Sequence, residues 1–293
     1  MVIPLINKFE IIDSMKDKYS IKLLCKVANA SRSGYYAWKH RKQIDMHKEL
    51  KEKILNVYNK SKQVYGYRRI KVALKKEYGL IINHKKIKRL MKQLNIKSKI
   101  RRRKFRYHIY KKIDRGNIEP NILNRNFTTT NINQKWVTDI TYLYYGKNRN
   151  KAYLSALMDL HNNEIISYKL STNLGLEFVI DTITEAFSRE KGCDLSKLII
   201  HSDQGFHYTS ILYKKLLRDN NVTQSMSRKG NCYDNACIEN FFGHLKSELI
   251  HLSFFETKEN LFRAVDEYIY WYNNHRFQSV LKNHTPIEYR CVA

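Results

Sequence analysis

Three acidic residues have types and surroundings that suit metal-dependent chemistry. Asp139 lies in Trp-Val-Thr-Asp-Ile-Thr, Asp203 lies in His-Ser-Asp-Gln-Gly after an apolar run, and Glu239 follows Asp203 with 35 residues between them. Converging carboxylates repel one another and attract Mg²⁺, which prefers oxygen ligands and keeps water positions for a substrate phosphate. Two such ions activate the attacking oxygen and stabilise the leaving oxygen of a displacement at phosphorus. We therefore predict a phosphoryl-transfer site with two Mg²⁺ or Mn²⁺ ions.

Each of these acids also has an ordinary structural explanation. Asp139 could be an exposed strand acid, Asp203 a turn-forming residue, and Glu239 a favourable charge at a helix N-terminus. Against this, aspartate is disfavoured in strands, and sites in open α/β sheets lie at the carboxyl ends of strands. Lys246, seven positions after Glu239, falls roughly on the same side of a helix and could reach a phosphate. Asp159 and Asp234 compete as ligands, but a turn explains each of them.

Other catalytic chemistries have weaker sequence support. His201 and Ser202 are adjacent, but no Gly-x-Ser-x-Gly elbow accompanies them, which disfavours a serine hydrolase. Cys232 and Cys237 form the closest cysteine pair, yet no further pair at zinc spacing is present. The five cysteines contain no Cys-x-x-Cys pair, as expected of a reduced, cytoplasmic protein.

The charge of the chain predicts a polyanionic partner. Among 293 residues there are 54 Lys and Arg against 27 Asp and Glu, a net charge of +27. Nucleic acid is the most common partner for a field of this size. A membrane surface is disfavoured, because the sequence has no basic amphipathic helix and no long apolar stretch. We therefore expect a cytoplasmic protein that binds nucleic acid.

The elements that must position the three acids follow from hydrophobic periodicity. Alternating apolar residues predict three strands joined by tight turns, then shorter apolar runs predict two further strands between helices. The expected strands are 135–145, 151–160, 164–170, 197–201 and 222–226, and the expected helices are 176–188, 210–217 and 259–274. This order predicts an α/β fold of the RNase H-like type, a five-stranded mixed sheet with flanking helices. A helix capped by Asp234 or Asn235 would carry Glu239.

The N-terminal third of the chain predicts an all-α region with two helix-turn-helix-like outlines. Ser31 or Ser33 can cap a helix over 35–41, Gly79 can end one helix, and Asn83 can begin another. The predicted domains are 1–45 (helical), 46–106 (a second helix-turn-helix-like unit with a basic arm), 107–131 (linker), 132–250 (catalytic core) and 251–293 (C-terminal helix and tail). The candidate DNA contacts are Lys246, Lys85, Lys88, Arg89, Lys92, Arg101, Arg102, Arg103, Lys104, Arg228 and Lys229.

Several motifs, in order and spacing, resemble those of one family. They are the stretches 136–141, 201–205 and 225–246 in the core, 31–38, 65–70 and 89–92 upstream, and 270–276 with 285–286 downstream. Together they resemble the second-frame (orfB) product of the IS-three group of bacterial insertion sequences, which has a retroviral-integrase-like catalytic core. One departure is Gln278, where the tail of that family often has histidine.

The resemblance implies a function and partners. Asp139, Asp203 and Glu239 would form the catalytic triad, and Lys246 would contact a DNA end. The activity would be nicking at element ends followed by strand transfer by the freed 3′-hydroxyl. The enzyme would act as a homo-oligomer on double-stranded DNA, together with or fused to an upstream-frame (orfA) product. Its location would be the bacterial cytoplasm, in association with the nucleoid. Two alternatives remain open: a non-catalytic DNA-binding regulator, and an RNase H-fold nuclease or resolvase that shares the carboxylates.

Overall fold

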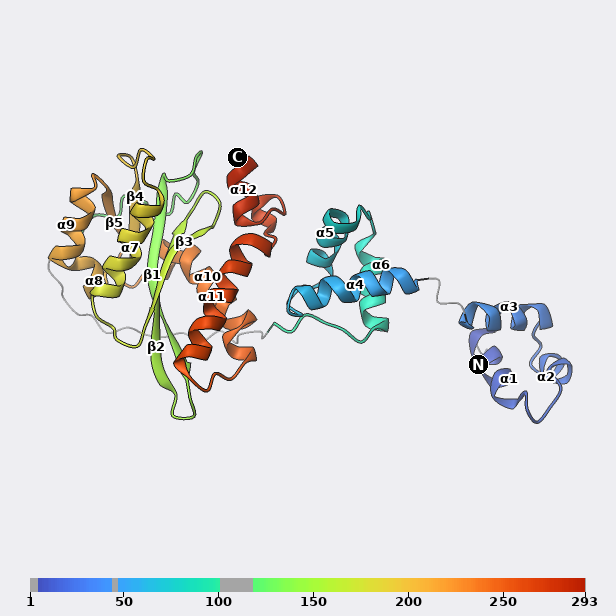
Figure 1. Ribbon diagram of the computed structural model, residues 1–293. Helices are drawn as coiled ribbons and strands as arrows, with labels where there is room; N and C mark the ends of the chain where they lie inside the picture. Colours follow the sequence, from blue (N-terminus) through green and yellow to red (C-terminus); the bar gives the residue numbers. More distant parts are fainter. Residues whose placement is uncertain (1–4, 44–46, 101–117, 293) are drawn as a thin grey trace.

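The computed structural model describes residues 5–43, 47–100 and 118–292, and its elements follow the predicted order (Figure 1). The N-terminal helices are α1 (Leu5–Met15), α2 (Ile21–Val27), α3 (Arg32–Gln43), α4 (Lys48–Lys60), α5 (Tyr67–Tyr78) and α6 (His84–Gln93). The strands are β1 (Lys135–Tyr145), β2 (Asn150–Asp159), β3 (Ile165–Ser171), β4 (Ile199–Ser202) and β5 (Thr223–Met226). The remaining helices are α7 (Glu177–Arg189), α8 (Phe206–Thr209), α9 (Ile211–Asp219), α10 (Ala236–Glu248), α11 (Lys258–His275) and α12 (Pro286–Val292). Three short 3₁₀ helices cover Cys232–Asn235, Ile250–Leu252 and Ser279–Leu281.

The five strands form one mixed sheet, which confirms the predicted fold class. The strand order is β3-β2-β1-β4-β5. The β1-β2 and β2-β3 pairs are antiparallel, whereas the β1-β4 and β4-β5 pairs are parallel. The predicted meander therefore supplies one half of the sheet, and the two short buried strands extend it on the other side of β1.

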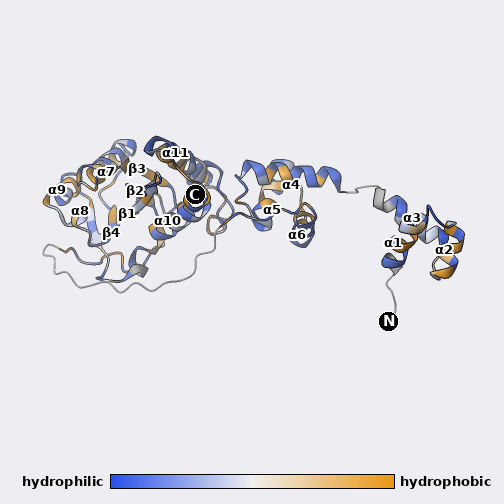
Figure 2. Ribbon diagram, turned by 90° about the horizontal axis from the view of Figure 1, so that it is seen from below, coloured by the Kyte–Doolittle hydropathy of each residue, from blue (hydrophilic) through white to orange (hydrophobic). Residues whose placement is uncertain are grey.

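Helices cover both faces of this sheet because side chains alternate between the two faces of each strand. Trp136 of β1 packs in a buried cluster with α7 and α9, whereas its neighbour Val137 packs in a cluster with α10 and α11. Asp139 has the same parity as Val137 and so belongs to the α10 side of β1. Figure 2 shows the apolar residues gathered along the strands and the inner sides of these helices.

Three of the predicted helix boundaries in the N-terminal region have the expected residues, although α3 begins at Arg32, three positions before the predicted start. Ser31 Oγ accepts a hydrogen bond of 3.2 Å from the Gly34 backbone N–H, which satisfies the first turn of α3. Asn83 Oδ1 accepts 2.8 Å from Lys85 N and caps α6. Gly79 ends α5 with a φ of +68°, a left-handed conformation that favours glycine. In helices α4–α6, Ile54, Ile70 and Leu90 are fully buried.

The region predicted as a linker lies against the core over its described part, 118–131. Ser225 Oγ of β5 accepts hydrogen bonds of 3.0 Å from the backbone N–H groups of both Ile122 and Leu123. Leu123 is buried, and Glu119 pairs with Lys214 of α9 at 2.5 Å. This stretch lacks regular periodicity because it follows the surface of the core.

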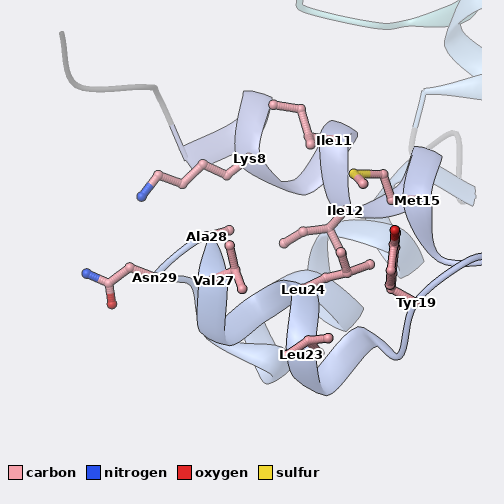
Figure 3. A pocket seen from close by; sticks show the side chains of 10 residues that line it. All are labelled: Lys8, Ile11, Ile12, Met15, Tyr19, Leu23, Leu24, Val27, Ala28 and Asn29. Carbon is pink, nitrogen blue, oxygen red and sulfur yellow. The ribbon is translucent and has the colours of Figure 1, made fainter.

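An apolar groove lies between α1 and α2 (Figure 3). Its volume is about 720 Å³, and Ile11, Met15, Leu23 and Val27 are among the residues that line it. All four of these side chains are more than one third exposed. The groove contains no carboxylate among its lining residues, so it is separate from the predicted chemistry. Within the described residues, no helix combines the length and the apolar character needed to cross a membrane.

Candidate active site

The parallel pairing of β1 and β4 brings Asp139 and Asp203 to the same level of the sheet. Val137 pairs with His201, and each aspartate lies two residues further along its strand direction. Asp139 is half-buried, and its Oδ1 accepts a hydrogen bond of 2.7 Å from the Ile140 backbone N–H. Asp203 is exposed just beyond the end of β4. The site therefore occupies the carboxyl end of the two central parallel strands, as the topology predicts.

Asp203 lies in a turn that requires glycine two positions later. Its Oδ1 accepts a hydrogen bond of 2.8 Å from the Gly205 backbone N–H. A Cβ atom at position 205 would lie 2.8 Å from that same oxygen, closer than carbon and oxygen can approach without a shift. Asp203 therefore has the turn-forming role that its sequence context allows. The same turn also holds its carboxylate in a defined position beside β1.

Glu239 lies exposed in the first turn of α10, where its chain is tied back to β1. Asn235 Nδ2 donates a hydrogen bond of 3.3 Å to the carbonyl oxygen of Thr138, the residue before Asp139. Asn235 is the N-cap residue of α10, as one of the two predicted alternatives, but its side chain makes no capping hydrogen bond. Its amide is used instead to hold the helix start against the strand.

Asp234, the other predicted cap, has a different structural role. It is fully buried and accepts hydrogen bonds from Arg228 Nε at 2.9 Å and Arg125 Nε at 2.8 Å. The hydrogen bonds from Arg228 hold the pKa of Asp234 well below its usual range. Burial would raise this pKa, but the bond from Arg125 also lowers it. Asp159 is likewise buried, and it accepts bonds of 2.7 and 2.8 Å from the backbone N–H groups of Asn133 and His161. Both acids are thus structural.

The charges of the four predicted site residues act on one another. Burial first, and then the charges of Asp203 and Glu239, raise the pKa of Asp139 to about 8. The hydrogen bond from the Ile140 N–H and the charge of Lys246 lower the pKa of Asp139. Burial and the charge of Asp203 also raise the pKa of Glu239. The structure therefore brings Asp139, Asp203, Glu239 and Lys246 into one electrostatic cluster.

The donor chemistry of this cluster fits a hard divalent cation. All three acids offer carboxylate oxygens. Burial first, and then the two neighbouring carboxylates, raise the pKa of Asp139, and a bound cation would favour its ionised form. Among the described residues, no group of three His, Cys, Asp or Glu side chains is arranged closely enough to hold a metal ion. The carboxylates thus supply the ligand types, and side-chain movement would be needed to complete a site.

His201 and Ser202 do not form a nucleophile-base pair. The two ring nitrogens of His201 lie 2.8 Å from Ser225 Oγ and 3.0 Å from Ser227 Oγ, inside the core. Burial lowers the pKa of His201 to about 4. The Ser202 hydroxyl instead donates to the Asp203 carbonyl oxygen at 3.0 Å. This arrangement agrees with the sequence, which disfavours a serine hydrolase.

The predicted DNA-contacting residues within the described part of the chain lie in α6, in α10 and in the turn after β5, and the one in α10, Lys246, is half-buried. The α6 residues Lys85, Lys88, Arg89 and Lys92 are all exposed, while Ile87, Leu90 and Met91 on the same helix are buried. In the turn after β5, Lys229 is exposed and Arg228 is held by Asp234. Arg101, Arg102, Arg103 and Lys104 lie outside the described residues.

Sequence reasoning missed the contacts that two residues near the site make, Asn235 and Arg125. Asn235 ties α10 to β1, and Arg125 reaches across from the 118–131 stretch to the buried Asp234. A polar residue four positions before Glu239 was visible in the sequence, but its partner, Thr138, lies 97 positions away along the chain. Local spacing contains no signal for such a contact.

A mixed five-stranded sheet with carboxylates on the central strands and a flanking helix defines the class of integrase-like polynucleotidyl transferases. Family models agree with this class. A model described as "Integrase core domain" matches residues 130–232, a second with the same description matches 239–292, and an "HTH-like domain" model matches 46–104.

The relatives identify the particular family. The chain is 39% identical over 282 residues to the putative transposase InsK for insertion sequence element IS150 of Escherichia coli K12, covering 96% of this chain and 97% of that protein. It is 32% identical over 267 residues to the transposase InsF for insertion sequence IS3A of the same organism, covering 89% and 90%. The chain belongs to the IS3 family of insertion-sequence transposases, as the motif resemblance predicts.

Among solved structures, the chain is similar to the catalytic core domain of HTLV-2 integrase in complex with magnesium. That match has 16% sequence identity and a TM-score of 0.40, and it covers 55% of this chain and 97% of that chain.

Proposed function

We propose that this transposase nicks DNA at the ends of its insertion sequence and joins the freed 3′-hydroxyl to target DNA. The observation that carries the proposal is the mutual influence of Asp139, Asp203 and Glu239 at the carboxyl end of the central parallel strands. Three carboxylates of this kind serve no packing purpose, since each raises the cost of ionising the others. They suit a site that is completed by cations and a phosphate.

Each site residue has a proposed role. Asp139, Asp203 and Glu239 would hold two Mg²⁺ or Mn²⁺ ions, which when bound activate the attacking oxygen and stabilise the leaving oxygen. Lys246, on the same helix as Glu239, would contact a backbone phosphate at the DNA end and hold it beside the carboxylates. Asn235 would keep the start of α10 against β1 while DNA binds.

The DNA duplex would be held mainly through its phosphates. The basic face of α6 is positioned for phosphate or groove contact, because its apolar side is buried and its charged side is exposed. Lys229 and the basic stretch 101–104 would add further phosphate contacts near the core. We propose that domains 46–106 and 132–250 act together on one DNA end, and that two or more copies act together because two ends must be joined.

The partners and the location follow from the family. We propose that an upstream-frame (orfA) product, separate or fused, supplies additional recognition of the element ends, and that the enzyme acts on the bacterial nucleoid in the cytoplasm. The apolar groove between α1 and α2 has no role in this proposal.

The experiment that tests the proposal is a metal-dependent nicking and joining assay. The substrate is labelled DNA that carries the sequences flanking this gene, with Mg²⁺ present or removed by chelation and with Glu239→Gln as the matched variant. We expect nicking at the 3′ ends and joined products in the wild type with metal, and neither in the variant. DNA binding without nicking, even with the upstream-frame protein added, would favour a regulator, and nicking without joining would favour a nuclease.

A further inference from the structure

The helix-turn-helix-like unit α4–α6 contacts the helices that follow the catalytic core. Tyr65, just before α5, donates a hydrogen bond of 2.5 Å to the His275 carbonyl oxygen and accepts one of 3.2 Å from the Phe277 backbone N–H. Its ring lies 6.0 Å from the rings of both Trp271 and Phe277. Tyr65 is buried, so these bonds are shielded from water and fix the start of α5 on the end of α11.

A second contact reaches the catalytic helix itself. Arg69 of α5 lies 3.6 Å from Glu248, the last residue of α10. Arg276 donates two hydrogen bonds to the same carboxylate, at 2.9 and 2.8 Å, and the Tyr268 hydroxyl donates a third at 2.8 Å. Both Glu248 and Arg276 are buried. Glu248 of α10 thus contacts both the helix-turn-helix-like unit, through Arg69, and the residue that follows α11, Arg276.

Further contacts lie on either side of this junction. Lys76 of α5 pairs with Glu288 of α12 at 2.6 Å and lies 4.7 Å from the centre of the Phe277 ring. Lys62 pairs with Glu267 of α11 at 3.3 Å at the surface. The stretch 62–76 therefore contacts α10, α11 and α12, which makes the unit a docked part of the catalytic body.

The two ends of α10 are thereby fixed by different partners. Asn235 ties its start to β1, and Glu248 ties its end to α5, nine positions after Glu239. A helix rises about 1.5 Å per residue and resists bending, so nine residues span roughly 13 Å. The buried α5–α6 packing continues this connection to the exposed basic face of α6. DNA bound on α6 would then lie at a set distance from the carboxylates.

We propose that Glu248 is a positioning residue whose contacts with Arg69 and Arg276 fix the catalytic helix relative to DNA bound on α6, and so set where the nick falls. This inference rests on the proposed nicking activity. It also predicts a physical coupling between α5 and α10 that can be measured without any reaction. The coupling between α5 and α10 is strong because Glu248 is buried. When it loses an arginine partner, water cannot replace the lost interaction, and the buried charge is left uncompensated.

The test uses the full chain with Arg69→Gln, Tyr65→Phe and the double variant. Arg69 is partly exposed, and Tyr65→Phe removes only a hydroxyl group, so both changes leave the Glu248–Arg276 pair intact. Glu164→Gln is the matched control, since Glu164 is a fully buried acid paired with Arg290 at 3.0 Å, in contact with α12 and not with α5.

Hydrogen exchange is measured first. We expect faster exchange in the last turn of α10 in the double variant and unchanged exchange there in Glu164→Gln. Unchanged α10 exchange in the double variant would overturn the inference, whatever the activity.

Nicking is then mapped at single-nucleotide resolution, with rates expressed per folded enzyme. We expect DNA-end affinity within about twofold of the wild type, turnover lower by roughly 10-fold to 100-fold, and nicks spread over neighbouring positions, because a small misplacement has a large effect on rate. A mere loss of stability, as in Glu164→Gln, would lower the yield of folded enzyme and leave the nick position unchanged. A wild type that couples α5 to α10 but never nicks would count against the proposed function alone.

Discussion

The side-chain amide of Asn235 donates a hydrogen bond of 3.3 Å to the carbonyl oxygen of Thr138. This bond joins the start of α10 to the strand residue next to Asp139, four positions before Glu239 on the helix. Asn235 is buried, and its amide oxygen has no hydrogen-bond partner among the described residues. This hydrogen bond therefore links the carboxylate on the strand to the helix that carries Glu239, in addition to the apolar packing of α10 against β1.

Replacing Asn235 by Ala should impair nicking more than binding. Without the amide, the start of α10 can move away from β1, and a small displacement of a reacting group can lower a rate by about 100-fold. We expect a lower turnover and an unchanged affinity for DNA ends, measured by single-turnover nicking and by a binding titration. Asn231→Ala is a suitable comparison, since Asn231 caps only the preceding 3₁₀ turn. Equal losses in both variants would contradict a specific role for Asn235.

Removing one carboxylate should stabilise the metal-free protein. The charges of Asp203 and Glu239 act after burial to raise the pKa of Asp139, so the three acids repel one another in the folded state. In chelator at pH 7, Asp203→Asn should melt about 2 °C or more above the wild type, since roughly 1 kcal/mol corresponds to a few degrees in a chain of this size. Mn²⁺ should raise the melting temperature of the wild type and not of the variant. An equal increase in melting temperature on addition of Mn²⁺ to both proteins would argue against these residues as metal ligands.

The basic face of α6 should supply salt-dependent, sequence-independent binding energy. Lys88→Ala and Arg89→Ala each remove one exposed cation from a helix that has no acidic residue. If each contacts one phosphate, the slope of log Kd against log salt should fall by about 1 per substitution. Binding titrations at several salt concentrations measure this slope. Lys215→Ala on α9 removes an equally exposed lysine, and its slope should stay close to that of the wild type.

The buried ion pair at the end of α10 should be costly to break. Arg276 is 2% exposed and donates two hydrogen bonds to Glu248. Arg276→Met leaves the carboxylate buried without its main partner, which should lower the free energy of unfolding by about 3 to 5 kcal/mol. Glu267→Gln removes a surface pair with Lys62 and should cost less than about 1 kcal/mol. Denaturant unfolding of the two variants compares these losses directly, and similar losses would show that Glu248 is resolvated.

Stability should fall as the pH decreases below neutrality, partly through His244. Burial, and then the charge of Arg276, lower the pKa of His244 to about 4, against about 6.5 in an unfolded chain. The charge of Glu248 raises the pKa of His244, whereas the charge of Arg69 lowers it, as that of Arg276 does. Because the folded state disfavours the proton, the contribution of His244 is complete above about pH 6.5 and is lost as the pH falls toward 4. Denaturant unfolding of His244→Gln should therefore show a smaller loss over this range than the wild type, and parallel curves would exclude this role.

The sequence by itself determined the chemistry and the local elements. The residue types of Asp139, Asp203 and Glu239 indicate hard-cation ligands. Alternation in 135–145 defines a strand, and helical periodicity in 84–93 defines a helix with a buried stripe and a charged outer face. These properties are local, because a strand or helix period and a capping residue such as Asn83 are encoded within a few positions of one another. The family resemblance extended this to the overall function.

Only the tertiary structure decided which distant residues meet. Arg69 and Glu248 are separated by 179 positions, and the Tyr65–His275 contact by 210, so no periodicity could indicate that α5 docks on the catalytic helix. The same reason explains why neither candidate cap residue uses its side chain as a cap, since Asn235 bonds to Thr138, 97 positions away, and Asp234 to Arg125, 109 positions away. Long-range contacts depend on how the layers pack around the sheet, and packing is a property of the whole fold.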